Sequence, residues 1–202
     1  MASQLKDSFT RPICVFCGSG RGRSPAYAAS AAKLGGLLAE QGITLVYGGG
    51  SIGLMRELAD AALDAGGRVV GVFPRVLQYL EAPHKRLTEL YVVGSMHERK
   101  ALMADLAEAF IALPGGFGTL EELCEVLTWA QLGMHRKPIG LLNVDRYYDR
   151  LLAFVERSIS EGFTDPAHRR LLIEATEPRE LLKKISRHEA TVGAASVGLR
   201  VN

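Results

Sequence analysis

The stretch LPGGFGTLEEL, residues 113–123, places a glycine-rich loop directly before two carboxylates. Its three glycines indicate a loop whose backbone N–H groups approach an anion at the start of a helix, where the helix dipole favours negative charge. Glu121 and Glu122 follow within the same stretch, and carboxylates beside a bound phosphate would repel it. The two residues must therefore serve the helix itself or a different part of the ligand.

Helix capping is the first explanation for these carboxylates. Thr119 and Glu122 match a capping box, in which the Thr side chain accepts from the N3 amide and the Glu side chain reaches back to the amide of the capping residue. Glu121 fits as a carboxylate in the first helical turn. The pattern leaves capping and catalysis equally open for Glu122 and favours capping for Glu121.

A second stretch with chemical potential is SMHERKALMADLAEAF, residues 95–110. Arg99 begins an apolar stripe at helical spacing, so its side chain is expected on the buried face of a helix. There its planar fork could donate two parallel hydrogen bonds to a phosphate or a carboxylate. The alternative is a local ion pair with Glu98 or Asp105, and the neighbouring Lys100 is expected to be solvated.

Glycine clusters follow three apolar runs, as CGSGRG at 17–22, YGGGSIG at 47–53 and PGGFGT at 114–119. If these runs are parallel strands, all three clusters lie at one edge of the sheet. Three converging loops of this kind describe a phosphate-sized crevice lined by backbone.

The middle cluster satisfies GxGxxG through Gly48, Gly50 and Gly53, which invites a dinucleotide interpretation. That fingerprint also expects an acidic residue about 20 positions further on, and residues 73–75 are Phe-Pro-Arg instead. Arg75 could meet an NADP phosphate, so an oxidoreductase is a minor hypothesis. No GxxxxGK followed by Ser or Thr occurs, which excludes a P-loop.

Six short apolar runs alternate with longer helical patterns. Strands are expected at residues 13–18, 43–49, 68–74, 87–93, 109–116 and 137–144, and helices near 24–41, 51–65, 95–108, 119–133, 146–161 and 178–187. Ser24, before Pro25, and Ser95 are expected helix caps. Strands without polar alternation are typical of a parallel sheet covered by helices on both faces. The sequence therefore predicts an α/β fold, a single-domain doubly wound (Rossmann-like) parallel sheet with its ligand at the carboxyl ends of the strands.

Composition is that of an ordinary globular domain, with 202 residues of which 48% are hydrophobic and 23% charged. A single domain is expected over 12–187, between a flexible N-terminus at 1–11 and a loose C-terminal tail at 188–202. The 24 basic and 22 acidic residues are spread along the chain, so nucleic acid is not an expected partner. No segment has signal-peptide or membrane-span character, so we expect a soluble cytoplasmic protein without a membrane partner.

The three cysteines are Cys14, Cys17 and Cys124, and the first two spell CxxC. Redox CxxC motifs open a helix, whereas this one lies in an expected strand, where positions three apart point to opposite faces. Both residues are therefore predicted to pack in the core. No second Cys or His pair follows at ligand spacing, so no metal site is expected.

The motifs together carry a family resemblance. PGGFGTLEE resembles the PGGxGTxxE motif of the LOG (LONELY GUY) family, and SMHERKALM is similar to the second signature of that family. The likeness runs from CVFCGSGRG near residue 14 through YGGGSIGLM and WAQLG to about Phe163. It implies a cytokinin riboside 5′-monophosphate phosphoribohydrolase, which cuts the N-glycosidic bond of N6-substituted AMP into free base and ribose 5-phosphate. It also implies a homodimer built from the helices around Trp129 and Gln131, with a nucleoside 5′-monophosphate as substrate.

The resemblance assigns roles to individual residues. Arg99 and Glu122 match the catalytic pair of the family. The substrate and phosphate contacts match Ser19, Gly49, Gly50, Met96, Lys100, Gly116, Gly118 and Thr119. One departure is Arg56, which stands where the family often has the last glycine of GLMG and bears on substrate preference. Some members carry a lysine decarboxylase label, yet no pattern in the chain points to pyridoxal-phosphate chemistry.

The implied reaction suits these residue types. Breaking a nucleoside C1′–N bond builds positive charge on the ribose, which a fixed carboxylate such as Glu122 can stabilise. Arg99 would anchor the nucleotide or position Glu122, and water is the nucleophile. The chemistry requires neither a metal nor a cofactor. The alternative is a noncatalytic nucleotide-binding or cofactor-carrier module of the same fold.

Overall fold

The computed structural model describes residues 12–79 and 81–188 of the chain. The expected N-terminal segment 1–11 and nearly all of the expected tail at 188–202 lie outside the described residues. The strands are β1 (Ile13–Phe16), β2 (Leu45–Tyr47), β3 (Val69–Pro74), β4 (Glu89–Val93), β5 (Ala109–Ala112), β6 (Ile139–Leu142) and β7 (Leu172–Ala175). The α-helices are α1 (Pro25–Glu40), α2 (Gly53–Asp64), α3 (Met96–Leu106), α4 (Phe117–Gln131), α5 (Asp149–Ser160) and α6 (Pro178–Arg187). Short 3-10 turns follow as η1 (Arg75–Leu77), η2 (Val144–Arg146) and η3 (Pro166–Leu171).

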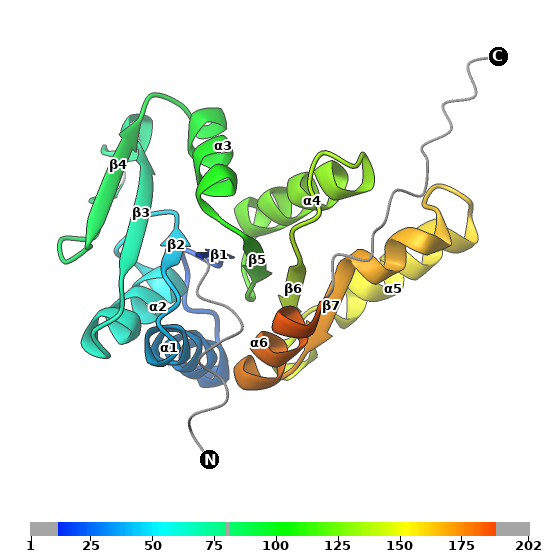
Figure 1. Ribbon diagram of the computed structural model, residues 1–202, viewed down its shortest axis with the longest axis horizontal. Coiled ribbons are helices and arrows are strands. Elements are labelled where there is room, and N and C mark those ends of the chain that lie inside the picture. Colours follow the sequence, from blue (N-terminus) through cyan, green and yellow to red (C-terminus); the bar gives the residue numbers. More distant parts are fainter. Residues whose placement is uncertain (1–11, 80, 189–202) are drawn as a thin grey trace.

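The strands form one sheet in the order β4-β3-β2-β1-β5-β6-β7 (Figure 1). Every neighbouring pair is parallel. The chain order reverses between β1 and β5, and this switch point is where an open parallel sheet leaves a crevice for a ligand. The predicted doubly wound α/β fold is therefore confirmed.

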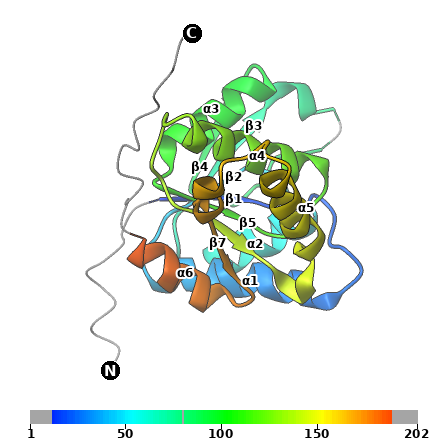
Figure 2. The ribbon, with the colours of Figure 1, turned by 90° about the vertical axis from the view of Figure 1, so that its right-hand side faces the viewer.

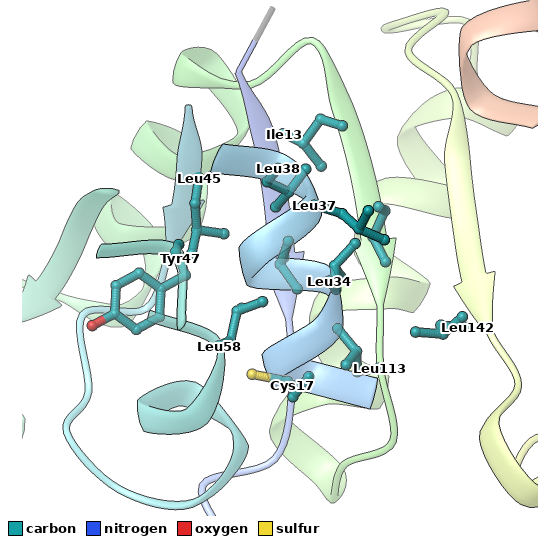
Figure 3. Close-up of a cluster of buried hydrophobic side chains, with 14 of the residues drawn as sticks. Ile13, Cys17, Leu34, Leu37, Leu38, Leu45, Tyr47, Leu58, Leu113 and Leu142 are labelled. Atoms are coloured by element: carbon teal, nitrogen blue, oxygen red, sulfur yellow. The ribbon is translucent and has the colours of Figure 1, made fainter. Parts of the chain in front are cut away.

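Helices cover both faces of the sheet, with α1, α2 and α6 on one face and α3, α4 and α5 on the other (Figures 1 and 2). Alternate residues of β1 serve the two sides, because successive side chains of a strand point to opposite faces. Ile13 packs in the cluster beneath α1, together with Leu34 and Leu38 (Figure 3), whereas Phe16 packs beneath α3 and α4.

A close approach of α1 and α2 depends on one glycine. A Cβ atom on Gly35 would lie 2.2 Å from the Leu58 carbonyl oxygen, so no larger residue fits at this crossing. This contact packs α1 against α2, the helix that begins at the second glycine loop.

The expected helix starts at Ser24 and Ser95 are confirmed. The Ser24 hydroxyl accepts from the Ala26 N–H at 3.3 Å, and the Ser95 hydroxyl accepts from the Glu98 N–H at 3.1 Å. Each cap satisfies one backbone donor that a helix start leaves unpaired. The Ser95 cap fixes where α3, with Arg99 in its first turns, begins.

The seventh strand, β7, was not among the predicted strands. Its sequence LIEA is only four residues long and contains Glu174, which pairs with Arg169. An edge strand is paired on one side only and tolerates such polar residues. Its pattern therefore differs from the uniformly apolar runs of the interior strands.

The two cysteines of the CxxC pair are free and buried, and they belong to opposite core clusters. Burial raises the pKa of Cys14 and of Cys17, which keeps both thiols protonated. The predicted packing role is confirmed. Within the described residues, no helix has the length and apolar character needed to cross a membrane.

Candidate active site

The three glycine clusters meet at the carboxyl edge of the sheet, as predicted. The Gly18 N–H donates to the Pro114 carbonyl at 3.1 Å, and the Leu54 N–H donates to the Gly18 carbonyl at 3.0 Å. Gly53 has a positive φ of 59°, and a Cβ atom there would lie 2.1 Å from the Ser19 carbonyl oxygen. The loops after β1, β2 and β5 are therefore joined by backbone contacts that only small residues allow.

A cavity of about 400 Å³ opens between these loops and the starts of α3 and α4. Seven of the predicted site residues line it, namely Ser19, Met96, Arg99, Gly116, Gly118, Thr119 and Glu122. Gly49, Gly50 and Lys100 are not among the described residues that line it. Two acids share the lining with Glu122, and one of them, Glu81, was not foreseen.

Arg99 and Glu122 form an ion pair across the gap between α3 and α4. The Arg99 Nη2 donates to the Glu122 Oε1 at 3.2 Å, with the two side chains 11% and 8% exposed. The expected burial of Arg99 is confirmed, whereas its alternative pairing with Glu98 or Asp105 is wrong, since Glu98 instead accepts from the Gly94 N–H at 2.8 Å. The Arg99 Nε is buried and has no hydrogen-bond partner among the described residues. The guanidinium thus keeps a donor that a ligand can use.

The protonation of Glu122 is poised near neutrality. Burial raises the pKa of Glu122 to about 7, and the positive charge of Arg99 offsets only part of that rise. A carboxyl with a pKa close to the working pH suits proton transfer and charge stabilisation, and perturbed groups of this kind concentrate at functional sites.

The capping interpretation of the two carboxylates is wrong. Helix α4 begins at Phe117 with Gly116 as its N-cap, so Thr119 is already the third helical residue. No side chain makes the N-cap hydrogen bond. Glu122 reaches Arg99 instead of a backbone amide, because the helix starts three residues earlier than a capping box with Thr119 as N-cap requires.

Glu121 lies beyond the first turn of α4, so the expectation of a first-turn carboxylate is also wrong. It pairs with Lys100, which bonds Glu125 as well at 3.1 Å. Lys100 is only 8% exposed, contrary to the expected solvation. Burial alone would lower the pKa of Lys100, but the hydrogen bonds to Glu121 and Glu125 outweigh it and raise that pKa. This cluster ties α3 to α4 beside the Arg99 and Glu122 pair.

Gly48, at the end of β2, serves the site in a way that the sequence analysis missed. A Cβ atom on Gly48 would lie 2.1 Å from the Arg99 Nη2, so this glycine makes room for the guanidinium. Its signal was present as the first glycine of a GGG run, but the GxGxxG match favoured phosphate binding as the role of that run.

A family described as "Possible lysine decarboxylase" matches residues 55–185. The chain is 53% identical over 178 residues to the rice (Oryza sativa subsp. japonica) protein named cytokinin riboside 5'-monophosphate phosphoribohydrolase LOG, covering 88% of this chain and 74% of that protein. It is 50% identical over 186 residues to the Arabidopsis thaliana protein named cytokinin riboside 5'-monophosphate phosphoribohydrolase LOG7, covering 92% of this chain and 85% of that protein. The chain belongs to the LOG family.

Solved structures similar to this LOG family member include proteins named for a different role. The molybdenum cofactor binding protein from the phototrophic bacterium Rippkaea orientalis matches with a TM-score of 0.66 and 26% identity, covering 87% of this chain and 97% of that one. The molybdenum cofactor carrier protein from Chlamydomonas reinhardtii matches with a TM-score of 0.64 at 24% identity, covering 87% of this chain and 95% of that one, and shows the fold alone. The LOG fold is thus shared with carriers, so the fold alone does not determine the function and the residues of the site do.

Proposed function

We propose that the protein is an N-glycosyl hydrolase that cleaves adenosine 5′-monophosphates, with or without an N6 substituent, into the free base and ribose 5-phosphate. The observation that carries this proposal is the buried Arg99 and Glu122 pair, which faces a cavity walled by glycine loops. The names of relatives about half identical to the chain support the same reaction.

The phosphate of the substrate is proposed to bind at the start of α4. Among the described residues, the N-cap there makes no side-chain hydrogen bond, so the first backbone N–H groups around Gly116, Gly118 and Thr119 can donate to an anion. Ser19 lines the same cavity from the loop after β1. Because Lys100 holds Glu121, the negative charge of that acid is compensated and repels the phosphate less.

Glu122 is proposed to face the ribose at the other end of the same ribose phosphate. In its ionised form the carboxylate stabilises the positive charge that develops as the C1′–N bond breaks, and it orients the attacking water. Arg99 holds Glu122 in place and offers its buried Nε to the nucleotide. Met96 lies against Arg99, with its sulfur 3.8 Å from Nη1, and forms the wall on the α3 side. Gly49 and Gly50 keep the neighbouring loop close to the sheet.

Product analysis tests the reaction. The purified protein is incubated with AMP and with N6-isopentenyl-AMP, and the products are separated chromatographically. We expect free base and ribose 5-phosphate in equal amounts, and no free base from a folded protein would refute the proposal.

The variant Glu122→Gln keeps the shape of the side chain and removes its charge. We expect it to bind nucleotide and to lose about 10²–10⁴ in kcat, the range typical of a positioned acid–base group. The control Glu161→Gln removes an exposed carboxylate at the end of α5 and should turn over at the wild-type rate. Equal rates for Glu122→Gln and wild type would remove Glu122 from the mechanism.

A carrier function is the second candidate, favoured by the 26% identity to the molybdenum cofactor binding protein of Rippkaea orientalis. Tight nucleotide binding without cleavage by the wild-type protein, and no effect of Glu122→Gln beyond stability, would support it. The oxidoreductase hypothesis is tested separately by whether NADPH binds at all.

We further infer a cytoplasmic homodimer. Leu132 and Met134 are exposed apolar side chains just beyond the end of α4 that contains Trp129, and Phe117 is a third at its start. Exposed apolar surface of this kind favours a protein partner. Light scattering after gel filtration should report twice the monomer mass, and a monomer at micromolar concentration would contradict the inference.

A further inference from the structure

The second glycine loop, residues 48–53 between β2 and α2, has the spacing of a dinucleotide-binding turn. Its helix α2 starts after Ile52, which is the N-cap and makes no side-chain cap hydrogen bond. A helix start of this kind presents backbone N–H groups that an anion can bind. In this protein, the chain itself supplies the anion.

Glu81 binds the backbone of that loop directly before the N-cap of α2. Its Oε1 accepts from the Ser51 N–H at 2.8 Å. A Cβ atom on Gly50 would lie 2.4 Å from the same Oε1, so the carboxylate lies directly against the loop backbone. Glu81 also lines the cavity that contains Arg99 and Glu122. The negative charge of Glu81 therefore acts both on the loop backbone and on a ligand bound in the cavity.

The residues after Glu81 hold it in this position. The Ser51 hydroxyl donates to the Ala82 carbonyl at 2.9 Å, and Gly50 pairs with Pro83 in an antiparallel bridge. The His84 N–H then donates to the Gly49 carbonyl at 2.9 Å. Contacts of the three consecutive residues 82–84 hold this segment along the glycine loop, so the Glu81 carboxylate has a fixed position in the site.

This arrangement makes the two ends of the cavity electrostatically unequal. A phosphate at Ser51 would have to displace Glu81, and a phosphate close to it would meet a fixed like charge in a partly buried site, where repulsion is strong. At the start of α4, by contrast, the nearby Glu121 is paired with Lys100. The cavity accepts an anion at the α4 end and rejects one at the α2 end.

We propose that Glu81 is a specificity-determining residue, which closes the second glycine loop to phosphate and so excludes nucleotides that carry a pyrophosphate. This inference rests on the proposed function, because it assumes that a nucleoside monophosphate binds with its phosphate at α4. It also explains why a GxGxxG match in this chain does not create a dinucleotide site.

Binding calorimetry with AMP and ADP tests the role of Glu81. The Glu122→Gln protein serves as background, so that bound nucleotide is not consumed, and Glu81→Gln or Glu81→Ala is added to it. Glu81→Gln keeps an acceptor for the Ser51 amide and removes only the charge, whereas Glu81→Ala also frees the amide. The matched control is Glu40→Gln, which removes the same charge from an exposed position at the end of α1.

We expect AMP affinity to change by less than about threefold, while ADP affinity relative to AMP rises about tenfold or more in both Glu81 variants, as removal of a near like charge implies. The Glu40→Gln ratio should equal that of the background. An unchanged ratio in both Glu81 variants, with folding verified by circular dichroism, would overturn the inference. Equal losses of AMP and ADP affinity would also overturn it, since Glu81 would then support the loop without discriminating.

Two separate measurements distinguish the role of Glu81 from the proposed hydrolase activity. Cleavage of AMP by the wild-type protein is measured separately, and cleavage with an unchanged ADP to AMP ratio refutes only the role of Glu81. A folded wild-type protein that does not cleave AMP, together with a folded background protein that binds no AMP, refutes both.

Discussion

The loops after β2 and β5 look alike in sequence and differ in what fills them. Both are glycine-rich, and both lead into a helix whose N-cap lacks a side-chain hydrogen bond. At the first, the carboxylate of Glu81 takes the Ser51 amide. At the second, the nearest acids turn away from the helix start, since Glu121 binds Lys100 and Glu122 binds Arg99. A glycine loop before a helix is therefore only a possible anion site, and the acids around it decide whether it is open.

The two loops also differ in how their acids are satisfied. Glu81 receives a backbone N–H in a partly buried position, whereas Glu122 is buried and pays a desolvation cost that Arg99 offsets only in part. The loop after β5 therefore lies beside an acid, Glu122, whose ionisation is unfavourable in the folded state. A raised pKa of this kind suits a reacting group. The cost of ionising Glu122 can be measured through the pH dependence of the free energy of unfolding.

The largest expected effect is on the pH dependence of stability in Glu122→Gln. Because the pKa of Glu122 is about 7 in the folded protein and near its usual 4.5 when unfolded, the folded state binds the extra proton between these pH values. Stability from this group is complete below about pH 4.5 and is lost as the pH rises through 7. Glu122→Gln should therefore exceed the wild type at pH 8 by up to about 3 kcal/mol, with little difference near pH 4.5.

Urea denaturation at pH 8 and pH 5 measures this difference. Glu161→Gln, at an exposed ion pair, is the control and should follow the wild type at both pH values. Equal stability of Glu122→Gln and wild type at pH 8 would show that Glu122 is ionised in the folded protein at no cost.

The next largest effect is a loss of kcat/KM when a glycine of the loop after β2 is replaced, compared with a glycine of the loop after β5. In Gly48→Ala the new Cβ would lie 2.1 Å from the Arg99 Nη2 and must displace the guanidinium, since the backbone cannot move as easily. We expect a folded protein whose kcat/KM falls about 10–100-fold, the order of loss for a misplaced active-site group. Gly116→Ala is the comparison, because its Cβ would meet nothing within 4 Å. It should keep wild-type thermal stability and change only the affinity for the nucleotide.

Unchanged kcat/KM in Gly48→Ala would mean that Arg99 has room elsewhere and that Gly48 serves only the turn. A loss of stability in Gly116→Ala equal to that in Gly48→Ala would contradict the proposed difference between the loops.

Much of the fold followed from sequence because the signal was local and repeated. Six interior or well-patterned strands and all six α-helices were expected within a few residues of their observed bounds, since apolar runs and caps such as Ser24 and Ser95 act over short distances. β7 was missed because a short edge strand carrying Glu174 lacks the apolar run.

The site was harder, because its decisive contacts join segments far apart in the chain. Arg99 and Glu122 were predicted individually, but their ion pair depends on how α3 crosses α4. The capping box was a sound local pattern, and tertiary packing overrode it with an earlier helix start at Gly116. Glu81 gave no signal at all, since it matches no motif and its partner Ser51, at a variable position of the second glycine cluster, is 30 positions away.

A smaller effect is expected from Gly118→Ala, in the first turn of α4. Alanine stabilises a helix relative to glycine, and a Cβ here would meet nothing within 4 Å, so unfolding free energy should rise by about 0.5–1 kcal/mol. The same methyl group lies where the phosphate is proposed to approach the backbone. We therefore expect KM for AMP to rise about fivefold, with kcat little changed, in steady-state assays. A stabilised protein with wild-type KM would move the phosphate site away from this turn.

The smallest effect is expected from Tyr147→Phe, which tests how a residue outside that loop holds the loop after β5 in place. The Tyr147 hydroxyl donates to the Gly115 carbonyl at 2.5 Å, directly before the N-cap of α4. Its neighbour Tyr148 donates in the same way to the Leu113 carbonyl at 2.5 Å, so the segment after β6 holds the loop at two points. Loss of one hydrogen bond near the surface is worth about 1 kcal/mol, and we expect KM to rise about threefold at unchanged kcat.

Tyr27→Phe, in the ring that meets Tyr147 edge-on, is the control and should leave KM unaltered. A fall in kcat with constant KM would instead place the influence of Tyr147 on Glu122, and would mean that the open loop positions the acid as well as the phosphate.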